Sequence, residues 1–176
     1  MPRVTLQVAR RADLPLIQGW FHDEATRRFL GGPGWPALMF DLLERPLGEF
    51  RGMRETGRHR WLAWDDGRAV GWIDSGTYDR WATWEGGAGG RGVVSSIAVP
   101  SACLGYVVDP ALRGQGYATS MIEAVLERPE LSEIELFVAG IQPENVASVR
   151  AATSAGFVPL DPEPDWEGFV YWARHR

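Results

Sequence analysis

The stretch LGYVVDPALRGQGYATSMIEAVLE, residues 104–127, has the residue types and spacing most suggestive of chemistry. Strand-like residues end at Asp109-Pro110, and a loop with two glycines then leads directly into a helical run. The first turn of a helix carries unpaired N–H groups and the positive end of the helix dipole. Glycines allow an anion to reach those amides without a Cβ in the way. The pattern favours a phosphate or pyrophosphate site, and a plain strand-to-helix turn is the alternative.

Two familiar phosphate loops fit this sequence poorly. A Walker loop requires a lysine, whereas all 18 basic residues of this chain are arginine. The absence of lysine also excludes Schiff-base chemistry and a lysine base. A dinucleotide-binding loop follows the first strand of a parallel unit, whereas GQGYAT lies past the middle of the chain and lacks the third glycine. A phosphate bound by this loop would therefore belong to a different class of ligand, and a plain turn stays the alternative.

The composition predicts a soluble globular protein. The 176 residues are 45% hydrophobic and 23% charged, and no apolar run approaches the roughly 18 residues of a membrane helix. No signal peptide is visible at the N-terminus, so we expect a cytoplasmic location and no membrane partner. A net charge of −5 argues against nucleic acid as a partner and mildly favours cationic substrates.

The cysteine and histidine content predicts neither disulfides nor a metal site. Cys103 is the single cysteine, and the pattern around it predicts a small buried strand residue rather than a reactive thiol. His22, His59 and His175 are far apart and have no metal-ligand spacing. Of nine tryptophans, five fall within residues 61–84. We expect most of these to be core residues, with a minority available to contact an ammonium group.

The first half of the chain alternates strand and helix patterns. Residues 3–9 alternate at period two and predict a strand, and Asp13 and Pro15 predict the start of a short helix. Residues 24–30 continue helically, and residues 31–36, GGPGWP, predict a loop. Residues 37–53 predict a helix that Pro46 and Gly48 interrupt and can divide in two.

The second half predicts strands, a glycine-rich loop and two further helices. Residues 59–64 and 68–78 predict a hairpin around a tight turn at Asp65-Asp66-Gly67. Residues 84–92, WEGGAGGRG, predict a mobile loop, either a lid or a disordered insertion. Further strands are expected at 93–99, 102–108, 133–140, 157–160 and 168–174, and helices at 117–127 and 143–156. The predicted fold is α/β: a single domain over residues 1–176 with a mixed, mostly antiparallel sheet of about seven strands flanked by helices.

Two motifs resemble one enzyme family. Arg113, Gly116 and Ala118 match a loop of the form Arg or Gln, two residues, Gly, one residue, Gly or Ala. This resembles the coenzyme A pyrophosphate loop of the GCN5-related N-acetyltransferase (GNAT) superfamily. Residues 133–160 are similar to the segment that follows in that superfamily: a strand, an Asn-x-x-Ser helix start and a Gly-Phe pair. Their form is closest to the ribosomal-protein and small-molecule acetyltransferase branch.

The resemblance implies acetyl-CoA as cosubstrate, an amine acceptor and no metal. It implies that the strand ending at Val108 splays open, binds the pantetheine arm and orients the thioester, while the loop and the next helix start bind the pyrophosphate. Polar contacts to the coenzyme are implied from the next helix. The implied coenzyme-binding residues are Tyr106, Val107, Val108, Arg113, Gly114, Gln115, Gly116, Tyr117, Ala118, Thr119, Asn145 and Ser148.

The sequence departs from the family pattern at the catalytic side chains. Many members place a tyrosine acid where this chain has Ala152, and several place a glutamate base where it has Gly140. Asp74 and Glu85 are the base candidates, with solvated carboxylates as the alternative. Tyr106 and Ser148 are the candidate donors to the leaving thiolate, with packing and helix capping as their alternatives.

The expected reaction is direct attack of a neutral amine on acetyl-CoA, with alignment and oxyanion stabilisation supplying much of the rate. A small cationic acceptor, aminoglycoside- or polyamine-like, is preferred because of the acidic balance and the tryptophans. A protein N-terminal amine, a non-catalytic acyl-CoA-binding module and binding of an unrelated nucleotide are the alternatives. Family members commonly pair, so the resemblance also implies a possible homodimer.

Overall fold

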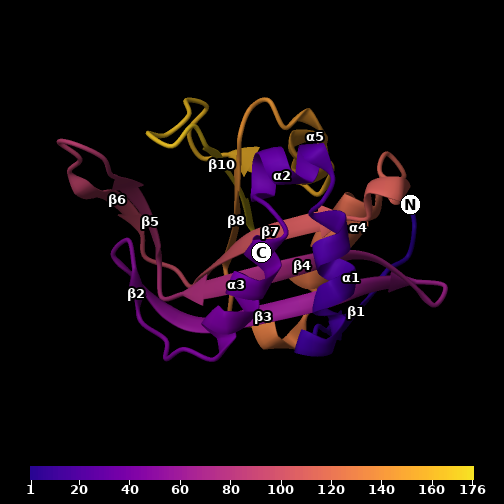
Figure 1. The fold of residues 1–176 in the computed structure, drawn as a ribbon. Coiled ribbons are helices and arrows are strands. Elements are labelled where there is room, and N and C mark those ends of the chain that lie inside the picture. The colour runs from indigo at the N-terminus through magenta and orange to yellow at the C-terminus, as the bar shows by residue number, and fades with distance from the viewer.

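The computed structural model describes all residues 1–176, which form one large sheet with helices on both faces (Figure 1). The eight-stranded sheet has the order β1-β3-β4-β7-β8-β10-β9, with β2 paired to β3. Every pair is antiparallel except β7 with β8, so the predicted mixed, mostly antiparallel sheet is confirmed. The strands are β1 (Thr5–Val8), β2 (Glu49–Phe50), β3 (Met53–Asp65), β4 (Arg68–Tyr78), β7 (Ser101–Val108), β8 (Leu136–Ile141), β9 (Val158–Pro159) and β10 (Val170–His175).

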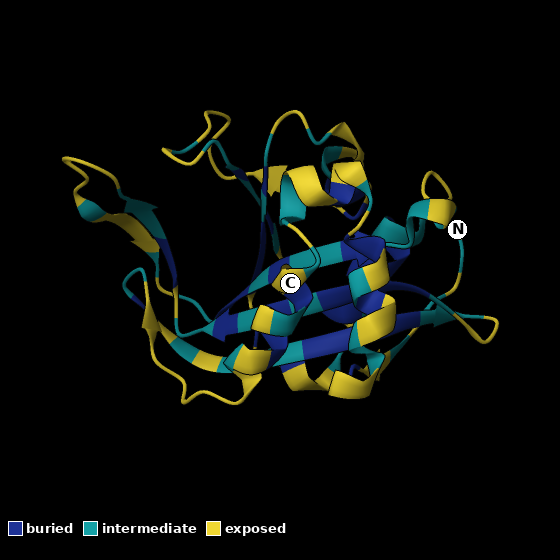
Figure 2. Ribbon diagram, in the orientation of Figure 1, coloured by how far each residue is buried: buried dark blue, intermediate teal, exposed yellow.

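Two layers of helices bury the sheet. Strands β3, β4 and β7 are buried along their middle, as Figure 2 shows. On one face, Leu62, Trp72 and Val107 pack with α1 and α3. On the other, Trp61, Ile73 and Leu104 pack with α4 and α5. Successive side chains of these strands point alternately into the two cores, so nearly every residue in the middle of each strand is apolar. The helices are α1 (Leu14–Trp20), α2 (Glu24–Leu30), α3 (Gly34–Leu43), α4 (Tyr117–Leu126) and α5 (Val146–Ser154), and the 3-10 turns are η1 (Arg11–Asp13), η2 (Pro110–Leu112) and η3 (Pro129–Leu131).

The first helices start and end differently from the sequence prediction. Asp13 does not cap α1, because its Oδ2 accepts a hydrogen bond of 2.7 Å from the Arg10 amide in the preceding turn. Helix α3 begins at Gly34, inside the stretch predicted to be a loop, and ends at Leu43. The predicted helix up to residue 53 is wrong beyond that point. Arg45 and Pro46 end the helical pattern, and their carbonyls accept hydrogen bonds from Arg58 on β3 instead.

A second, two-stranded sheet was not predicted. The strands β5 (Trp81–Glu85) and β6 (Gly92–Ile97) pair only with each other, and their hairpin projects from the main sheet (Figure 1). The glycine-rich stretch supplies the loop of this hairpin, at residues 86–91. Strand β6 was expected at residues 93–99 and is present, but it does not join the central sheet. None of the helices is both long and apolar enough to cross a membrane.

The parallel contact between β7 and β8 is short, and this positions the site. Register pairs join Ser101–Cys103 to Leu136–Val138, and none is present beyond them. Strand β7 continues to Val108 against β4 on its other edge, while β8 continues to Ile141 against β10. The two strands therefore separate from Leu104 onward. Backbone N–H and C=O groups of β7 on this side have no strand partner and face an opening in the sheet.

Candidate active site

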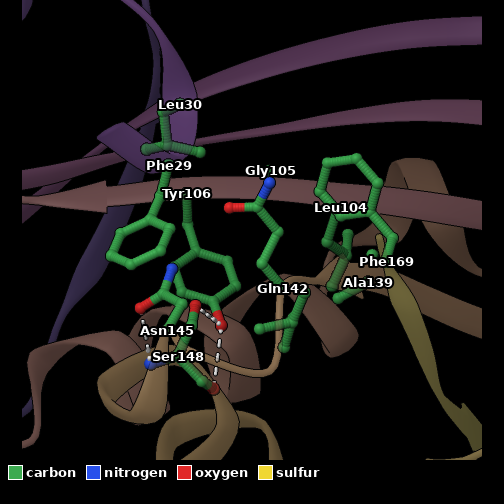
Figure 3. Close-up of a pocket in the computed structure, with 12 residues that line it drawn as sticks. Phe29, Leu30, Leu104, Gly105, Tyr106, Ala139, Gln142, Asn145, Ser148 and Phe169 are labelled. Carbon is green, nitrogen blue, oxygen red and sulfur yellow. Dashed lines mark hydrogen bonds between the residues drawn. The ribbon is translucent and has the colours of Figure 1, made fainter. Parts of the chain in front are cut away.

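A groove of about 590 Å³ lies at the opening between β7 and β8. The C-terminal part of β7 forms one wall, and the first turns of α4 and α5 form another. Helix α2, about 80 residues earlier in the chain, supplies a further side through Thr26, Phe29 and Leu30. A smaller cavity of about 50 Å³ shares Phe29, Leu30 and Tyr106 with the groove and extends to Gly105 (Figure 3). It is also lined by Gly140 of β8. The expected splay of the strand that ends at Val108 is thus present, and it opens into a groove.

The glycine loop has the backbone conformation that glycine favours. Gly114 has φ +77° and Gly116 has φ +87°, and Gly116 is the left-handed residue directly before α4. Gly114, Gly116, Tyr117, Ala118 and Thr119 all line the groove, whereas Gln115 is exposed and does not. Because no side chain caps the N-terminus of α4, the amides of its first turn are available to an anion.

Arg113 anchors the loop to helix α2. Its Nη2 atom donates to Asp23 Oδ2 at 2.7 Å and to Thr26 Oγ1 at 2.6 Å. Asp23 also caps α2 by accepting from the Thr26 amide at 2.9 Å. The Arg113 guanidinium holds the pKa of the Asp23 carboxyl below its usual range. Arg113 therefore connects the loop to the far wall of the groove, which adds a structural role to the predicted contact with a coenzyme.

Tyr106 and Ser148 meet across the groove, as Figure 3 shows. The Ser148 hydroxyl donates to the Tyr106 hydroxyl at 2.8 Å, and the Tyr106 hydroxyl makes only a long contact of 3.3 Å to the Ser148 carbonyl. Asn145 precedes α5, and its Oδ1 accepts from the Ser148 amide at 3.3 Å. Burial raises the pKa of the Tyr106 phenol, which therefore keeps its proton at neutral pH. That proton is weakly engaged within the chain and can be donated to a ligand.

A row of residues on one face of the sheet places Asp74 beside the opening. Cross-strand register joins Arg60 on β3 to Asp74 on β4, and Asp74 to Gly105 on β7. Gly140 on β8 is paired with Tyr171 on β10. A Cβ on Gly105 would overlap Asp74 Oδ1, so glycine at this position allows the carboxylate to lie across β7. Gly105 lines the smaller cavity, and Asp74 lies directly behind it without being part of the lining.

Asp74 has the ionisation expected of a base working near neutral pH. Burial raises its pKa to about 6, against the attraction of Arg60, which lowers it. The Asp74 side chain remains 18% exposed. A carboxylate with a pKa just below neutral is ionised at pH 7 and is a stronger base than an ordinary aspartate.

Glu85 lies outside both cavities. It ends β5 in the projecting hairpin, where its Oε2 accepts from Arg91 Nε at 2.7 Å. Its side chain is 38% exposed. The structure therefore brings Asp74, Tyr106 and Ser148 to the opening and leaves Glu85 in the hairpin.

Gly140 and Ala152, the two positions that depart from the family pattern, are both closely surrounded by other residues. A Cβ on Gly140 would lie 3.0 Å from the Tyr171 ring, which occupies the space of any larger side chain there. Tyr171 also packs against Trp81, with ring centroids 5.3 Å apart. Ala152 lies on α5 and is fully buried in the core between that helix and the sheet. Tyr106 packs against that same core, so a phenol from β7 reaches the region of α5.

Several residues of the site had no signal in the sequence. Phe29 and Leu30 of α2 line both cavities, and Phe169 and Gln142 extend into the smaller one (Figure 3). Their placement depends on contacts between distant segments, such as Arg113 with Asp23. The structure gathers no group of three His, Cys, Asp or Glu side chains suited to a metal ion.

Comparison with known proteins gives one family and a consistent set of folds. The family described as Acetyltransferase (GNAT) domain matches residues 3–158. A Bacillus subtilis (strain 168) protein named uncharacterized N-acetyltransferase YfmK is 25% identical over 166 residues, which cover 93% of this chain and 91% of that protein.

Solved structures of similar fold include aminoglycoside acetyltransferases. The structure of AAC(6')-Ib in complex with ribostamycin and coenzyme A has a TM-score of 0.73 and 17% identity, and covers 99% of this chain and 94% of that one. The aminoglycoside N(6')acetyltransferase of Legionella pneumophila has a TM-score of 0.67 and 15% identity, with 99% and 93% coverage. At these identities the similarity concerns the fold.

Proposed function

Because the chain belongs to the acetyltransferase (GNAT) family and is an N-acetyltransferase, we propose that it transfers an acetyl group from acetyl-CoA to the primary amine of a small cationic acceptor. The observation that carries the proposal is the opening between β7 and β8. A groove of about 590 Å³ meets an uncapped helix start there, and the adjoining smaller cavity is lined by Gly105, the cross-strand neighbour of a carboxylate with a pKa of about 6.

The groove suits the shape and charge of a coenzyme A arm. The backbone of β7 from Leu104 to Val108 is unpaired toward the opening and can bind the amides of a pantetheine chain. The amides at the start of α4 are suited to a pyrophosphate, and the lining contains the guanidinium groups of Arg150 and of Arg113, which is paired with Asp23. The predicted residues Val107, Asn145 and Thr119 also line the groove.

The side chains at the opening account for the proton movements of acyl transfer. Asp74 would accept a proton from the acceptor amine, directly or through a water, as the C–N bond forms at the thioester carbon. The C–S bond then breaks, and the Tyr106 hydroxyl would donate a hydrogen bond to the leaving sulfur. The raised pKa of Tyr106 favours such a hydrogen bond over full proton transfer. Unpaired β7 amides can stabilise the oxyanion of the intermediate.

Two observations support a cationic acceptor. The net charge of the chain is −5, and Asp74 and Tyr171 lie next to Gly105 and Gly140, which line the smaller cavity. Carboxylates and aromatic faces both attract ammonium groups. The similarity of fold to enzymes solved with aminoglycosides such as ribostamycin and kanamycin is consistent with this class. The preference for the ribosomal-protein and small-molecule branch belongs to the same proposal.

Calorimetric titration with acetyl-CoA, CoA and ATP tests the cosubstrate first. We expect saturable micromolar binding of acetyl-CoA and of CoA, and none of ATP. Binding of ATP in competition with acetyl-CoA would instead favour a general nucleotide site. Absence of acetyl-CoA binding would remove the proposed role of the groove.

An acetylation assay over aminoglycosides, polyamines and peptides tests the acceptor. We expect turnover with small polyamines or aminosugars. Activity confined to peptides would favour a protein N-terminal amine, and tight coenzyme binding without turnover on any acceptor would favour a non-catalytic acyl-CoA-binding module. The homodimer and the cytoplasmic location stay predictions.

A further inference from the structure

Arg60 is a buried arginine next to the candidate base. It lies on β3, is only 5% exposed, and is the direct cross-strand partner of Asp74. The Arg60 Nη1 atom lies 3.8 Å from Asp74 Oδ2, which is an ion pair without a hydrogen bond. Removing a guanidinium from water is costly unless a nearby charge compensates it. Asp74 is the carboxylate within ion-pair distance.

The other contacts of Arg60 account for only part of its hydrogen-bonding capacity. Nη1 donates to the His59 carbonyl at 2.8 Å, and Nη2 donates to the Met39 carbonyl of α3 at 3.2 Å. The buried Nε atom has no partner. The contact with α3 therefore uses only one of the five N–H groups of the Arg60 side chain, so attaching this helix to the sheet does not by itself explain a buried arginine here.

The thiol and the phenol neighbouring Asp74 keep their protons at physiological pH. Burial raises the pKa of the Cys103 thiol on β7 to about 12, and it also raises the pKa of the Tyr78 phenol on β4. Glu55, which also interacts with Arg60, is paired with Arg58 on β3. Arg60 is therefore the cation that balances the charge of Asp74.

The geometry points to Arg60 as a positioning residue that keeps Asp74 ionised and directed over Gly105, ready to accept the proton of the acceptor amine. The separation of 3.8 Å is important for this role, because a direct hydrogen bond from the guanidinium would occupy the carboxylate and weaken it as a base. Oδ2 faces Arg60, whereas Oδ1 lies beside Gly105, which lines the cavity. The inference rests on the proposed function, in which Asp74 is the base.

The test compares Arg60→Met, Arg60→Gln and Arg60→Lys with the natural protein. The acid limb of kcat/KM for the acceptor should shift upward by at least one pH unit in Arg60→Met and in Arg60→Gln, and Arg60→Lys should restore most of the original profile. Ionisation of the acceptor amine is common to all variants and cancels in the comparison. Arg54→Met is the matched control, because Arg54 lies on the same strand with its side chain 73% exposed.

A carboxyl ¹³C NMR titration gives a readout independent of activity. The Asp74 signal, assigned by its absence in Asp74→Asn, should titrate near pH 6 in the natural protein and at least one unit higher without the arginine. Folded Arg60 variants with lower kcat but unchanged titration and pH limb would assign Arg60 a purely structural role and overturn the inference.

The Asp74→Asn variant separates this inference from the proposed function. If the acid limb persists in Asp74→Asn, Asp74 is not the base, and both the proposed mechanism and the role of Arg60 fail. If the limb disappears in Asp74→Asn but does not move in Arg60→Met, only the role of Arg60 fails.

Discussion

Replacement of Asp74 by asparagine should inactivate the enzyme and stabilise its fold. The Asp74 pKa is raised from 3.8 to about 6 by burial, so the folded state resists ionisation of this group. A difference of roughly 2 pKa units, at about 1.36 kcal/mol each, corresponds to a cost of about 3 kcal/mol at neutral pH. The cost of about 3 kcal/mol already takes the attraction between Asp74 and Arg60 into account, because protonation of Asp74 removes that attraction just as the asparagine does. Asparagine has the same shape without the charge and should recover most of this energy.

The gain in stability from Asp74→Asn should increase as the pH rises. Between pH 4 and pH 6 the folded state holds the Asp74 proton and the unfolded state does not, so this group lowers stability as the pH rises. The difference in free energy of unfolding between Asp74→Asn and the natural protein should be near zero at pH 4 and reach its full size above pH 7. For a chain of this length, about 3 kcal/mol corresponds to a higher Tm by roughly 6–12 °C.

Urea denaturation and thermal melts at pH 4, 5, 6 and 7.5 measure this difference directly. Asp66→Asn is the matched control, because Asp66 is exposed in a hairpin turn with φ +44°, a conformation that asparagine also accepts. Two results would refute the assignment of Asp74 as a carboxylate whose pKa is raised by burial. One is an Asp74→Asn protein that is less stable than the natural protein at pH 7.5. The other is a gain in stability at pH 4 as large as the gain at pH 7.5.

Three further substitutions test other parts of the site. Gly105→Ala should lower kcat at least tenfold, because its Cβ would displace the Asp74 carboxylate, whereas Gly32→Ala in open space should not; equal activities would contradict this. Gly116→Val should weaken acetyl-CoA binding about tenfold by calorimetry, because the free loop would leave φ +87° and restoring that conformation in the complex costs roughly 1–2 kcal/mol; unchanged affinity in a folded protein would reject the loop. Tyr106→Phe should lower kcat at least tenfold with little change in acetyl-CoA affinity, and the reverse pattern would assign Tyr106 to binding alone.

The sequence was sufficient for features set by local interactions. The positive φ angles at Gly114 and Gly116, the Asp66-Gly67 hairpin turn and the Asn145 cap of α5 each depend on a few consecutive residues. Glycine conformation, turn preference and capping are properties of the local chain, so the loop and the adjoining helix could be predicted from their residues alone. The family resemblance rests on these same short stretches, and the family match over residues 3–158 is consistent with it.

The tertiary structure alone decided how these pieces form a site. Helix α2 covers the groove because Arg113 binds Asp23, a contact across 90 positions of sequence. The pairing of β5 with β6 outside the main sheet placed Glu85 away from the opening. Period-two patterns identify strands but not their neighbours, so the partners of β5 and β6 could not be inferred from the sequence.

The row from Arg60 through Asp74 to Gly105 is the clearest case of such dependence on pairing. Each residue is ordinary for a strand in its own segment, and a shift of one position in the register of β3 or β7 would move its residue to the opposite face of the sheet. Arg60 comes from the neighbouring strand of the same hairpin, but its pairing with Asp74 depends on the register shift between Ala63 and Trp64, and Gly105 comes from β7, which the hairpin turn does not place. The sequence by itself determined where a phosphate could bind, and long-range strand pairing determined which carboxylate stands beside it.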